Sequence, residues 1–349
     1  MHRHTVKRGV AKSLGLNLCL IYFTRMNNDF WIRNWLYFNA FMVFCMAIIG
    51  AVTRLTESGL SMVEWRPIIG AIPPLSHEEW IRVFDLYRQT PEYQKINAGM
   101  SLDAFKNIFF WEWFHRVWGR LIGLVYALPL LIFWIKNMIP QGYKKHLLAL
   151  LFLGGCQAVM GYIMVLSGLA DRPSVSHFKL AAHLSLAFVI FGYLLWLAFC
   201  LSNIKPKLTT FCRRRHGWIA MIILGITIIW GAFMAGKDAG LVSSSWPHMF
   251  HGVMIPSEFQ TVTFSSFMNN ETIIHFSHRW IALLALISIL AFAWRVKAIA
   301  LGGAVLFQFG LGVATIMSLV AIPIAAMHQA GAFILAALLL KELYALRDS

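Results

Sequence analysis

Four histidines lie in long apolar segments at matched places in the sequence, and they are the residues best suited to bind a metal centre. They are His115, His183, His278 and His328. His115 and His278 are each followed by arginine, while His183 and His328 each begin the pattern His-x-x-x-Ala-Phe. A lone histidine in an apolar helix needs only one polar neighbour, but two pairs in the same register indicate a shared binding function.

Heme iron is the centre that this pattern favours. Two imidazoles from facing helices can serve as axial ligands, and apolar helix walls can hold the porphyrin. A zinc or copper ion would need a third or fourth ligand from cysteine, aspartate or another histidine. No cysteine in the apolar segments occupies a repeated position, so the sequence predicts bis-histidine heme binding.

One acid distinguishes the two histidine pairs. Glu112 lies three residues before His115, and this spacing places both side chains on one face of a helix. The matching position before His278 is His275. We therefore predict that Glu112 is catalytic and acts at the first pair only.

Other charged residues near the histidines are expected to have supporting roles. Arginine binds carboxylates through paired hydrogen bonds, so nearby cations are candidate partners of heme propionates, although anchoring to lipid headgroups explains any single one equally well. These cations are Arg54, Arg116, Arg120, Lys237 and Arg279. Two further acids, Glu57 and Asp238, occupy matching positions and indicate a shared structural role such as capping.

The elements that must position these residues are membrane-spanning helices. Hydrophobic residues make up 59% of the 349 residues, and the mean hydropathy is +0.65. Continuous apolar runs of about 20 residues, the length that crosses a bilayer, predict eight helices. They lie near residues 35–54, 113–135, 146–168, 177–201, 217–236, 273–294, 298–319 and 324–341. Continuous runs exclude the alternating pattern of a membrane barrel, so the predicted fold is an all-α integral membrane protein.

An internal repeat divides the predicted helices into two sets of four. Residues 50–60 and 231–241 share the spacing of their glycines and acid, and Gln157-x-x-x-Gly161 matches Gln308-x-x-x-Gly312. We expect two pseudosymmetric four-helix bundles in parallel. The predicted divisions are a tail at 1–33, a first half at 34–201 with a long loop at 55–110, a basic linker at 202–216 and a second half at 217–349.

The basic residues predict the orientation in the membrane. The formal net charge is +15, and Lys and Arg gather in 1–33, 136–145, 202–216, 295–297 and 341–349. The positive-inside rule places these segments and both termini in the cytoplasm, with loop 55–110 outside. The charge therefore reflects topology, and nucleic-acid binding is not expected. The acid-free N-terminal segment also fits a mitochondrial transit peptide, so the mitochondrial inner membrane is the alternative to the plasma membrane.

The long loop carries two helix-start signals of its own. Ser76 with Glu79 is typical of a capping box, and Ser101 can cap a helix that continues into the second apolar segment. These signals suggest an ordered lid on the membrane, while a solvated connector remains the alternative.

The chain resembles the heme A synthase family. The segment Arg54-Leu-Thr-Glu-Ser-Gly-Leu-Ser61, the motif Glu112-x-x-His115-Arg116, His183, His278-Arg279 and His328 carry the resemblance, which covers nearly the whole chain after about residue 30. It implies a permanent heme b between His278 and His328, and substrate heme O near His115 and His183. It also implies oxidation of a ring methyl to a formyl group through the alcohol, with electrons leaving through heme b to an unidentified acceptor.

The resemblance further implies heme O synthase and cytochrome oxidase assembly proteins as partners, besides the membrane lipid. Many bacterial members have a cysteine pair in the first outer loop, whereas the cysteines here are Cys19, Cys45, Cys156, Cys200 and Cys212. The chain is thus similar to the proteobacterial and mitochondrial branch, and an electron route through that disulfide is not expected.

Other function classes make different predictions. A diheme b-type electron carrier would bind two hemes permanently and would have no use for an acid beside only one of them. A transporter is disfavoured because the polar residues gather in the outer third of the helices and not at the midplane. A farnesyl transferase would need clustered aspartates for magnesium, and the sequence has no Asp-x-x-Asp motif.

Overall fold

Eight long apolar helices dominate the structure, which is a computed structural model describing residues 3–64, 69–169, 174–250, 252 and 255–348. The helices are α1 (Arg3–Leu55), α4 (Leu102–Ile135), α5 (Tyr143–Leu169), α6 (His177–Cys200), α7 (Phe211–Gly236), α9 (Glu271–Val296), α10 (Ile299–Met317) and α11 (Ile322–Ala345). Among the described residues these eight, counting Asn27–Leu55 of α1, are long and apolar enough to cross a membrane. The predicted all-α membrane architecture is confirmed.

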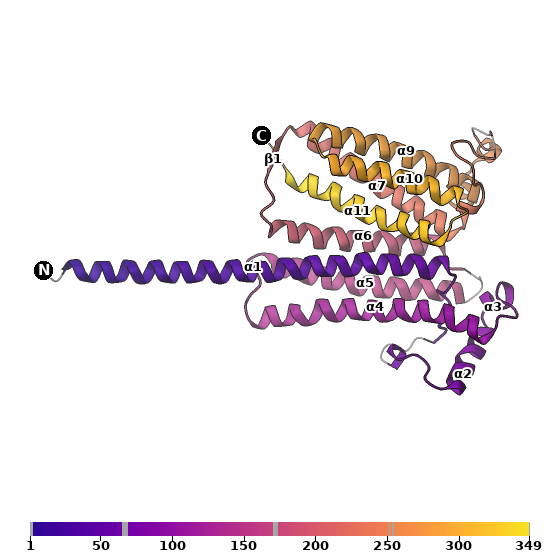
Figure 1. Cartoon of the computed structure of the whole chain (residues 1–349), viewed down its shortest axis with the longest axis horizontal. Helices are drawn as coiled ribbons and strands as arrows, with labels where there is room; N and C mark the ends of the chain where they lie inside the picture. The colour runs from indigo at the N-terminus through magenta and orange to yellow at the C-terminus, as the bar shows by residue number, and fades with distance from the viewer. Residues whose placement is uncertain (1–2, 65–68, 170–173, 251, 253–254, 349) are drawn as a thin grey trace.

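The helices lie side by side, with α1 and α6 at the centre (Figure 1). Helix α1 packs against α4, α6 and α11, and α6 packs against α5, α7 and α11. Half of the apolar window of α1 is buried, compared with 6% for α5. The central helix is therefore covered by protein, while α5 leaves most of its surface for lipid.

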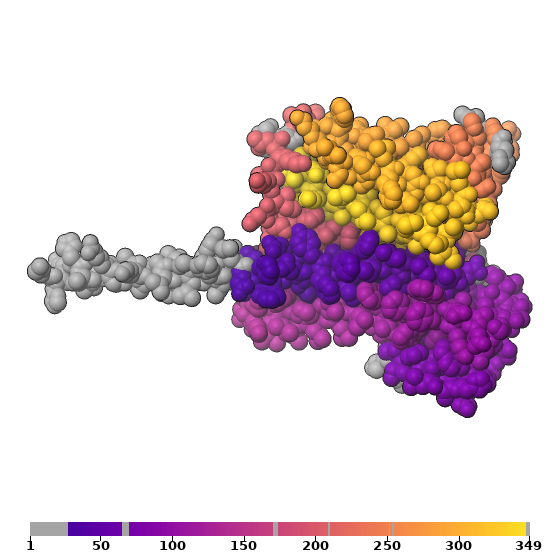
Figure 2. Space-filling view, in the orientation of Figure 1, coloured from indigo at the N-terminus to yellow at the C-terminus, as the bar shows by residue number. Residues whose placement is uncertain are grey.

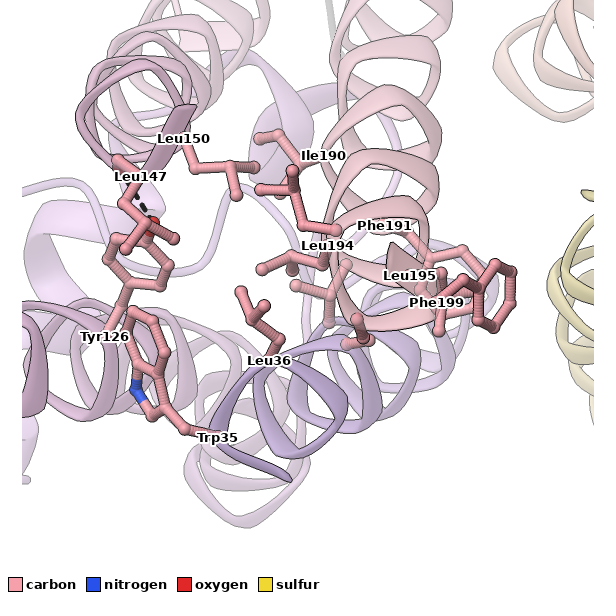
Figure 3. Close-up of a cluster of buried hydrophobic side chains, with 14 of the residues drawn as sticks. Trp35, Leu36, Tyr126, Leu147, Leu150, Ile190, Phe191, Leu194, Leu195 and Phe199 are labelled. Carbon is pink, nitrogen blue, oxygen red and sulfur yellow. Dashed lines mark hydrogen bonds between the residues drawn. The ribbon is translucent and has the colours of Figure 1, made fainter. Parts of the chain in front are cut away.

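The first set of helices, α1, α4, α5 and α6, shares one apolar core. Trp35 of α1 packs against Tyr126 of α4 in a tilted arrangement with ring centroids 4.7 Å apart, and the Tyr126 hydroxyl donates to the Leu147 carbonyl at 2.8 Å (Figure 3). Leu36 and Leu194 fill the space beside them and are fully buried. Aromatic packing with a satisfied hydroxyl fixes the mutual height of three helices.

The second set, α7, α9, α10 and α11, has a core of its own, which includes Leu224, Ile289, Phe292, Leu301 and Leu339. The two sets meet at aromatic residues that follow the matched histidines. Phe188 of α6 stacks on Phe333 of α11 with centroids 3.8 Å apart, and each phenylalanine lies five residues after its histidine. The Gln329 side chain also donates to the Ala47 carbonyl of α1 at 3.0 Å.

The segment 56–101, which we call the cap, packs over one end of α4 with its described residues, 56–64 and 69–101 (Figures 1 and 2). It contains η1 (Ile69–Ala71), α2 (His77–Arg88) and α3 (Pro91–Lys95). Ser76 caps α2 and Ser101 caps α4, each accepting a backbone N–H at 3.2 Å, so both predicted helix starts are confirmed. A small apolar core within the cap includes Phe84 and Tyr87 and packs on Phe105 and Phe109 of α4.

The opposite end of the bundle carries a short parallel pair of strands that the sequence did not predict. Strand β1 (Lys207–Thr209) pairs with β2 (Leu346–Asp348), and the Lys207 ammonium binds Glu342 at 2.7 Å. These contacts tie the linker at 202–216 to the end of α11. Both termini lie at this end (Figure 1), and the backbone of the predicted tail is helical from Arg3.

The described residues of the loop between α7 and α9 form only short elements. They are η2 (Ala239–Leu241), η3 (Ser257–Thr261) and α8 (Phe264–Asn269). Thr263 and Ser266 form a reciprocal capping box at the start of α8. This loop lies at the same end of the bundle as the cap (Figure 1).

Candidate functional site

Each of the four histidines packs against a glycine on a neighbouring helix. A Cβ placed on the glycine would lie 3.0 to 3.6 Å from the imidazole, in the pairs Gly50 with His115, Gly161 with His183, Gly231 with His278 and Gly312 with His328. Protein interiors are close-packed, so at the shorter of these distances a larger residue would displace the ring. The repeated glycines therefore leave the space that the histidine rings occupy.

The histidines lie in two pairs, each shared between two helices. His115 of α4 and His183 of α6 lie near enough to interact electrostatically, as do His278 of α9 and His328 of α11. The part of the chain that the structure describes contains no group of three or more His, Cys, Asp and Glu residues suited to a metal ion. Paired imidazoles without a third ligand suit the axial positions of a heme and do not suit a zinc site.

One histidine of each pair is held by a glutamine that the sequence analysis did not assign to the site. The Gln157 amide donates to the His183 carbonyl at 3.1 Å and approaches the His183 ring at 3.3 Å. The Gln308 amide donates to the His328 carbonyl at 2.8 Å and approaches the ring at 3.2 Å. The signal was present as the repeated Gln-x-x-x-Gly motif, but spacing alone did not show what the amide binds.

Glu112 is the point where the cap is attached to α4. Its side chain is buried and accepts hydrogen bonds from the Ser61 hydroxyl at 2.8 Å and from the Met62 N–H at 2.6 Å. The other carboxylate oxygen forms an ion pair with Arg116 one turn later in the helix. Three donors therefore satisfy this buried charge and fix its position.

Arg116 and Arg279 bind the backbone of matching loops. Arg116 donates to the carbonyls of residues 62 and 64 at 2.8 and 3.3 Å. Arg279 donates to the carbonyls of residues 243 and 245 at 3.3 and 2.9 Å, which are the matching positions at the offset of the repeat. His275, which takes the place of Glu112, is completely buried. The two loops are thus bound by matching arginine contacts, and the first loop is bound by Glu112 as well.

The remaining predicted cations also have protein partners. Arg54 binds the Asp238 carboxylate at 2.8 Å and the Ala235 carbonyl at 2.7 Å, which links the end of α1 to the end of α7. Lys237 pairs with Glu271 at 2.9 Å. Arg120 lies one turn beyond Arg116 and is partly buried. The Nε of Arg279 is buried and has no hydrogen-bond partner among the described residues.

The matched acids Glu57 and Asp238 share an unusual backbone conformation. Both have φ of 51°, in the left-handed region, directly after α1 and α7 end. A left-handed residue commonly terminates a helix. This geometry agrees with a structural role for both positions.

A second buried acid, Glu92 in the cap, was missed by the sequence analysis. It is 4% exposed and accepts a hydrogen bond from the Tyr87 hydroxyl at 3.0 Å, which in turn accepts one from the Asn97 amide at 2.7 Å. Burial, reinforced by the negative charges of Glu112 and Glu57, raises the pKa of Glu92 to about 8. The cap is not repeated in the second half, so no matching position drew attention to this residue.

Comparison with known proteins gives a consistent result. The family described as "Cytochrome oxidase assembly protein" matches residues 33–340. The chain is 45% identical to "Heme A synthase" of Rhodospirillum centenum, over 90% of this chain and 87% of the relative. It is 43% identical to "Heme A synthase" of Parvibaculum lavamentivorans, over 86% and 90%, and 41% identical to that of Paramagnetospirillum magneticum, over 90% and 92%.

Proposed function

This chain belongs to the heme A synthase family, and from that premise we propose that it oxidises a ring methyl of heme O to a formyl group through a hydroxymethyl intermediate. The observation that carries this proposal is the asymmetry between two otherwise matched histidine pairs. Both pairs rest on glycines and are held by glutamines, but only the first has an acid, Glu112, beside it.

The second pair fits a permanent heme b. His278 and His328 lie near each other, Gln308 orients His328, and the buried Nε of Arg279 would donate a hydrogen bond to a propionate. Heme b bound there would supply the route by which electrons leave the substrate. The apolar helices around the pair would exclude water from it.

The first pair is proposed to receive heme O. His115 and His183 would hold its iron, and Gly50 and Gly161 set the positions of the two rings. Arg54, Arg116, Arg120 and Lys237 are the candidate partners of propionates at this end of the bundle. Arg54 binds both of its protein acceptors, the Ala235 carbonyl and the Asp238 carboxylate, through one terminal nitrogen, so its guanidinium retains further N–H donors.

Glu112 is proposed to supply a fixed negative charge beside the reacting methyl. Removing electrons from the macrocycle develops positive charge, and a preorganised carboxylate stabilises it without rearrangement. The three hydrogen-bond donors around Glu112 keep it in place.

The protein is a multi-pass membrane protein. We propose the plasma membrane as its location, since its relatives are bacterial, with both termini on the cytoplasmic side. On this orientation the cap lies outside. Heme O synthase would supply the substrate, and cytochrome oxidase assembly proteins would accept the product.

The function is tested by expressing the full chain in a bacterial strain that lacks heme A. Chromatography of extracted hemes should show heme A and the hydroxymethyl intermediate, while a strain with an empty vector should accumulate heme O. Heme O alone, in cells whose membranes contain the protein with its heme b spectrum, would contradict the proposal.

A diheme electron carrier is the second candidate, and the close match of the two glycine-backed pairs is the observation that favours it. A carrier should purify with two non-exchanging protohemes per chain. A synthase should purify with one heme b and partial occupancy by heme O or heme A. Pigment extraction after purification separates the two.

A further inference from the structure

We propose that Glu92 of the cap accepts protons released during the oxidation and passes them to Glu57 at the protein surface. The inference rests on the proposed function. With water as the oxygen source, the balanced change is R–CH3 + H2O → R–CHO + 4 H+ + 4 e−. Heme b bound at the second histidine pair would supply the route for the electrons to a quinone acceptor, so the protons need a separate route out of the apolar site.

The position of Glu92 fits such a route. Phe105, Phe109 and Glu112 follow one another at helical spacing on one face of α4. Tyr87 stacks on Phe105 with centroids 5.2 Å apart, and its hydroxyl reaches the Glu92 carboxyl. Glu92 therefore lies above the same face of α4 that carries Glu112.

The neighbours of Glu92 lead from the site to the surface. Glu112 is buried, while Glu57 at the end of α1 is exposed, and both lie near enough to act on Glu92 through their charges. Thr53 of α1 donates to the Trp111 carbonyl at 3.3 Å, which brings the end of α1 beside α4 at this level. The positive charge of Arg54 also acts on Glu92 and lowers its pKa. The Tyr87 hydroxyl donates a hydrogen bond to the Glu92 carboxyl.

The carboxyl of Glu92 has fewer hydrogen-bond donors around it than the carboxylate of Glu112. Glu112 is bound by three donors, but the hydrogen bond that the described residues give the Glu92 carboxyl comes from Tyr87 alone. A proton acceptor works best when its pKa is near the working pH, and the pKa of Glu92 is raised to about 8. Because Glu92 acts on protons that have already left the substrate, it is not a catalytic residue.

The test uses the full chain with heme b in lipid nanodiscs, given heme O and a soluble quinone as electron acceptor. Formation of the hydroxymethyl product and heme A is followed by chromatography from pH 6 to 9.5. An acceptor must be ionised, so the rate should rise with pH through about 8. Glu92→Gln should lower the rate by about 10-fold or more and abolish this rise.

Two further variants test whether a slower rate in Glu92→Gln comes only from damage to the structure of the cap. Tyr87→Phe removes the hydrogen bond that lowers the pKa of Glu92, so the rise in rate should move to higher pH. Glu78→Gln changes an exposed acid of the same cap and should leave the rate and its pH profile unchanged. The heme b spectrum should be the same in every variant.

Infrared titration gives a readout that does not depend on turnover. The wild-type chain should show a protonated carboxyl band that disappears near pH 8, and Glu92→Gln should lack it. If the wild-type chain forms no heme A but keeps this band, the proposed function fails while Glu92 still titrates as described. A wild-type pH profile in Glu92→Gln, or no such band in the wild-type chain, would overturn the inference.

Discussion

Gly312 leaves just enough room for the His328 ring, since a Cβ there would lie 3.0 Å from its Cε1. Gly310 lies two residues away on the same helix, and a Cβ there would meet no atom within 4 Å. The two glycines look equivalent in sequence, because both favour close approach of helices. Only the positions of neighbouring side chains show which glycine makes room for a histidine ring.

The first prediction compares these two glycines. Gly312→Val should push the His328 ring from its position and lower the heme b content of the purified protein several-fold, at a cost of about 1–3 kcal/mol from overpacking. Gly310→Val should retain heme b, because its side chain meets open space. The absorbance of heme b per chain measures both. Equal heme loss in the two variants would contradict the role of Gly312 in making room for the ring.

The second prediction concerns Glu112. Glu112→Gln keeps the shape of the side chain but removes its charge, which leaves the buried Arg116 without its ion-pair partner. Heme b should be retained, while conversion of heme O to heme A should fall by about 100-fold, a typical loss for one electrostatic contact. Chromatography of hemes from cells expressing the variant measures this. Heme A at the normal rate would exclude a role for this carboxylate in the reaction.

At the scale of elements, α4 connects the cap to the histidine pairs. Its outer turns bind the cap through Phe105, Phe109 and Glu112, and the next turns carry His115 and Arg116. The Trp113 indole also donates to the Ala71 carbonyl of η1 at 3.1 Å. A change in the cap is therefore transmitted directly to the helix that holds His115.

The third prediction is a pH dependence of cap stability. The pKa of Glu92 is about 8 in the folded cap and about 4.5 when exposed, so the folded cap retains a proton that the unfolded cap has lost. Stability from this group should therefore fall as pH rises from about 4.5 to about 8 and level off above that.

Limited proteolysis of the cap at pH 6 and pH 9 measures this dependence. The wild-type cap should be cleaved faster at pH 9, after correction for protease activity with an unfolded substrate. In Glu92→Gln the difference between the two pH values should be much smaller. An unchanged difference would show that another group controls cap stability.

At the scale of the whole molecule, the sequence predicted features that have a local signal and missed contacts between distant segments. The eight spans and the helix starts at Ser76 and Ser101 were evident because apolar length and capping residues are local signals. The contacts of Arg116 and Arg279 were not evident, because their partners are backbone carbonyls that any residue can supply. The strand pair at 207–209 and 346–348 joins distant segments too short to carry a pattern.

Contacts between the two helix sets indicate that they work as one unit. Phe188 stacks on Phe333, Gln329 binds Ala47, and Arg54 binds Asp238. These contacts join the helices that carry the two histidine pairs, as the proposed transfer of electrons between them requires. Under the proposed function the two halves of the repeat have different tasks, with Glu112 marking the first pair as the site of oxidation.

The division of tasks between the histidine pairs is tested most directly by four single alanine variants, with bound heme b and extracted hemes measured in the same preparations. His278→Ala and His328→Ala should lose the heme b spectrum. His115→Ala and His183→Ala should keep the heme b spectrum and accumulate heme O without heme A. Loss of heme b in the His115 and His183 variants, with retention in the other two, would contradict the assignment.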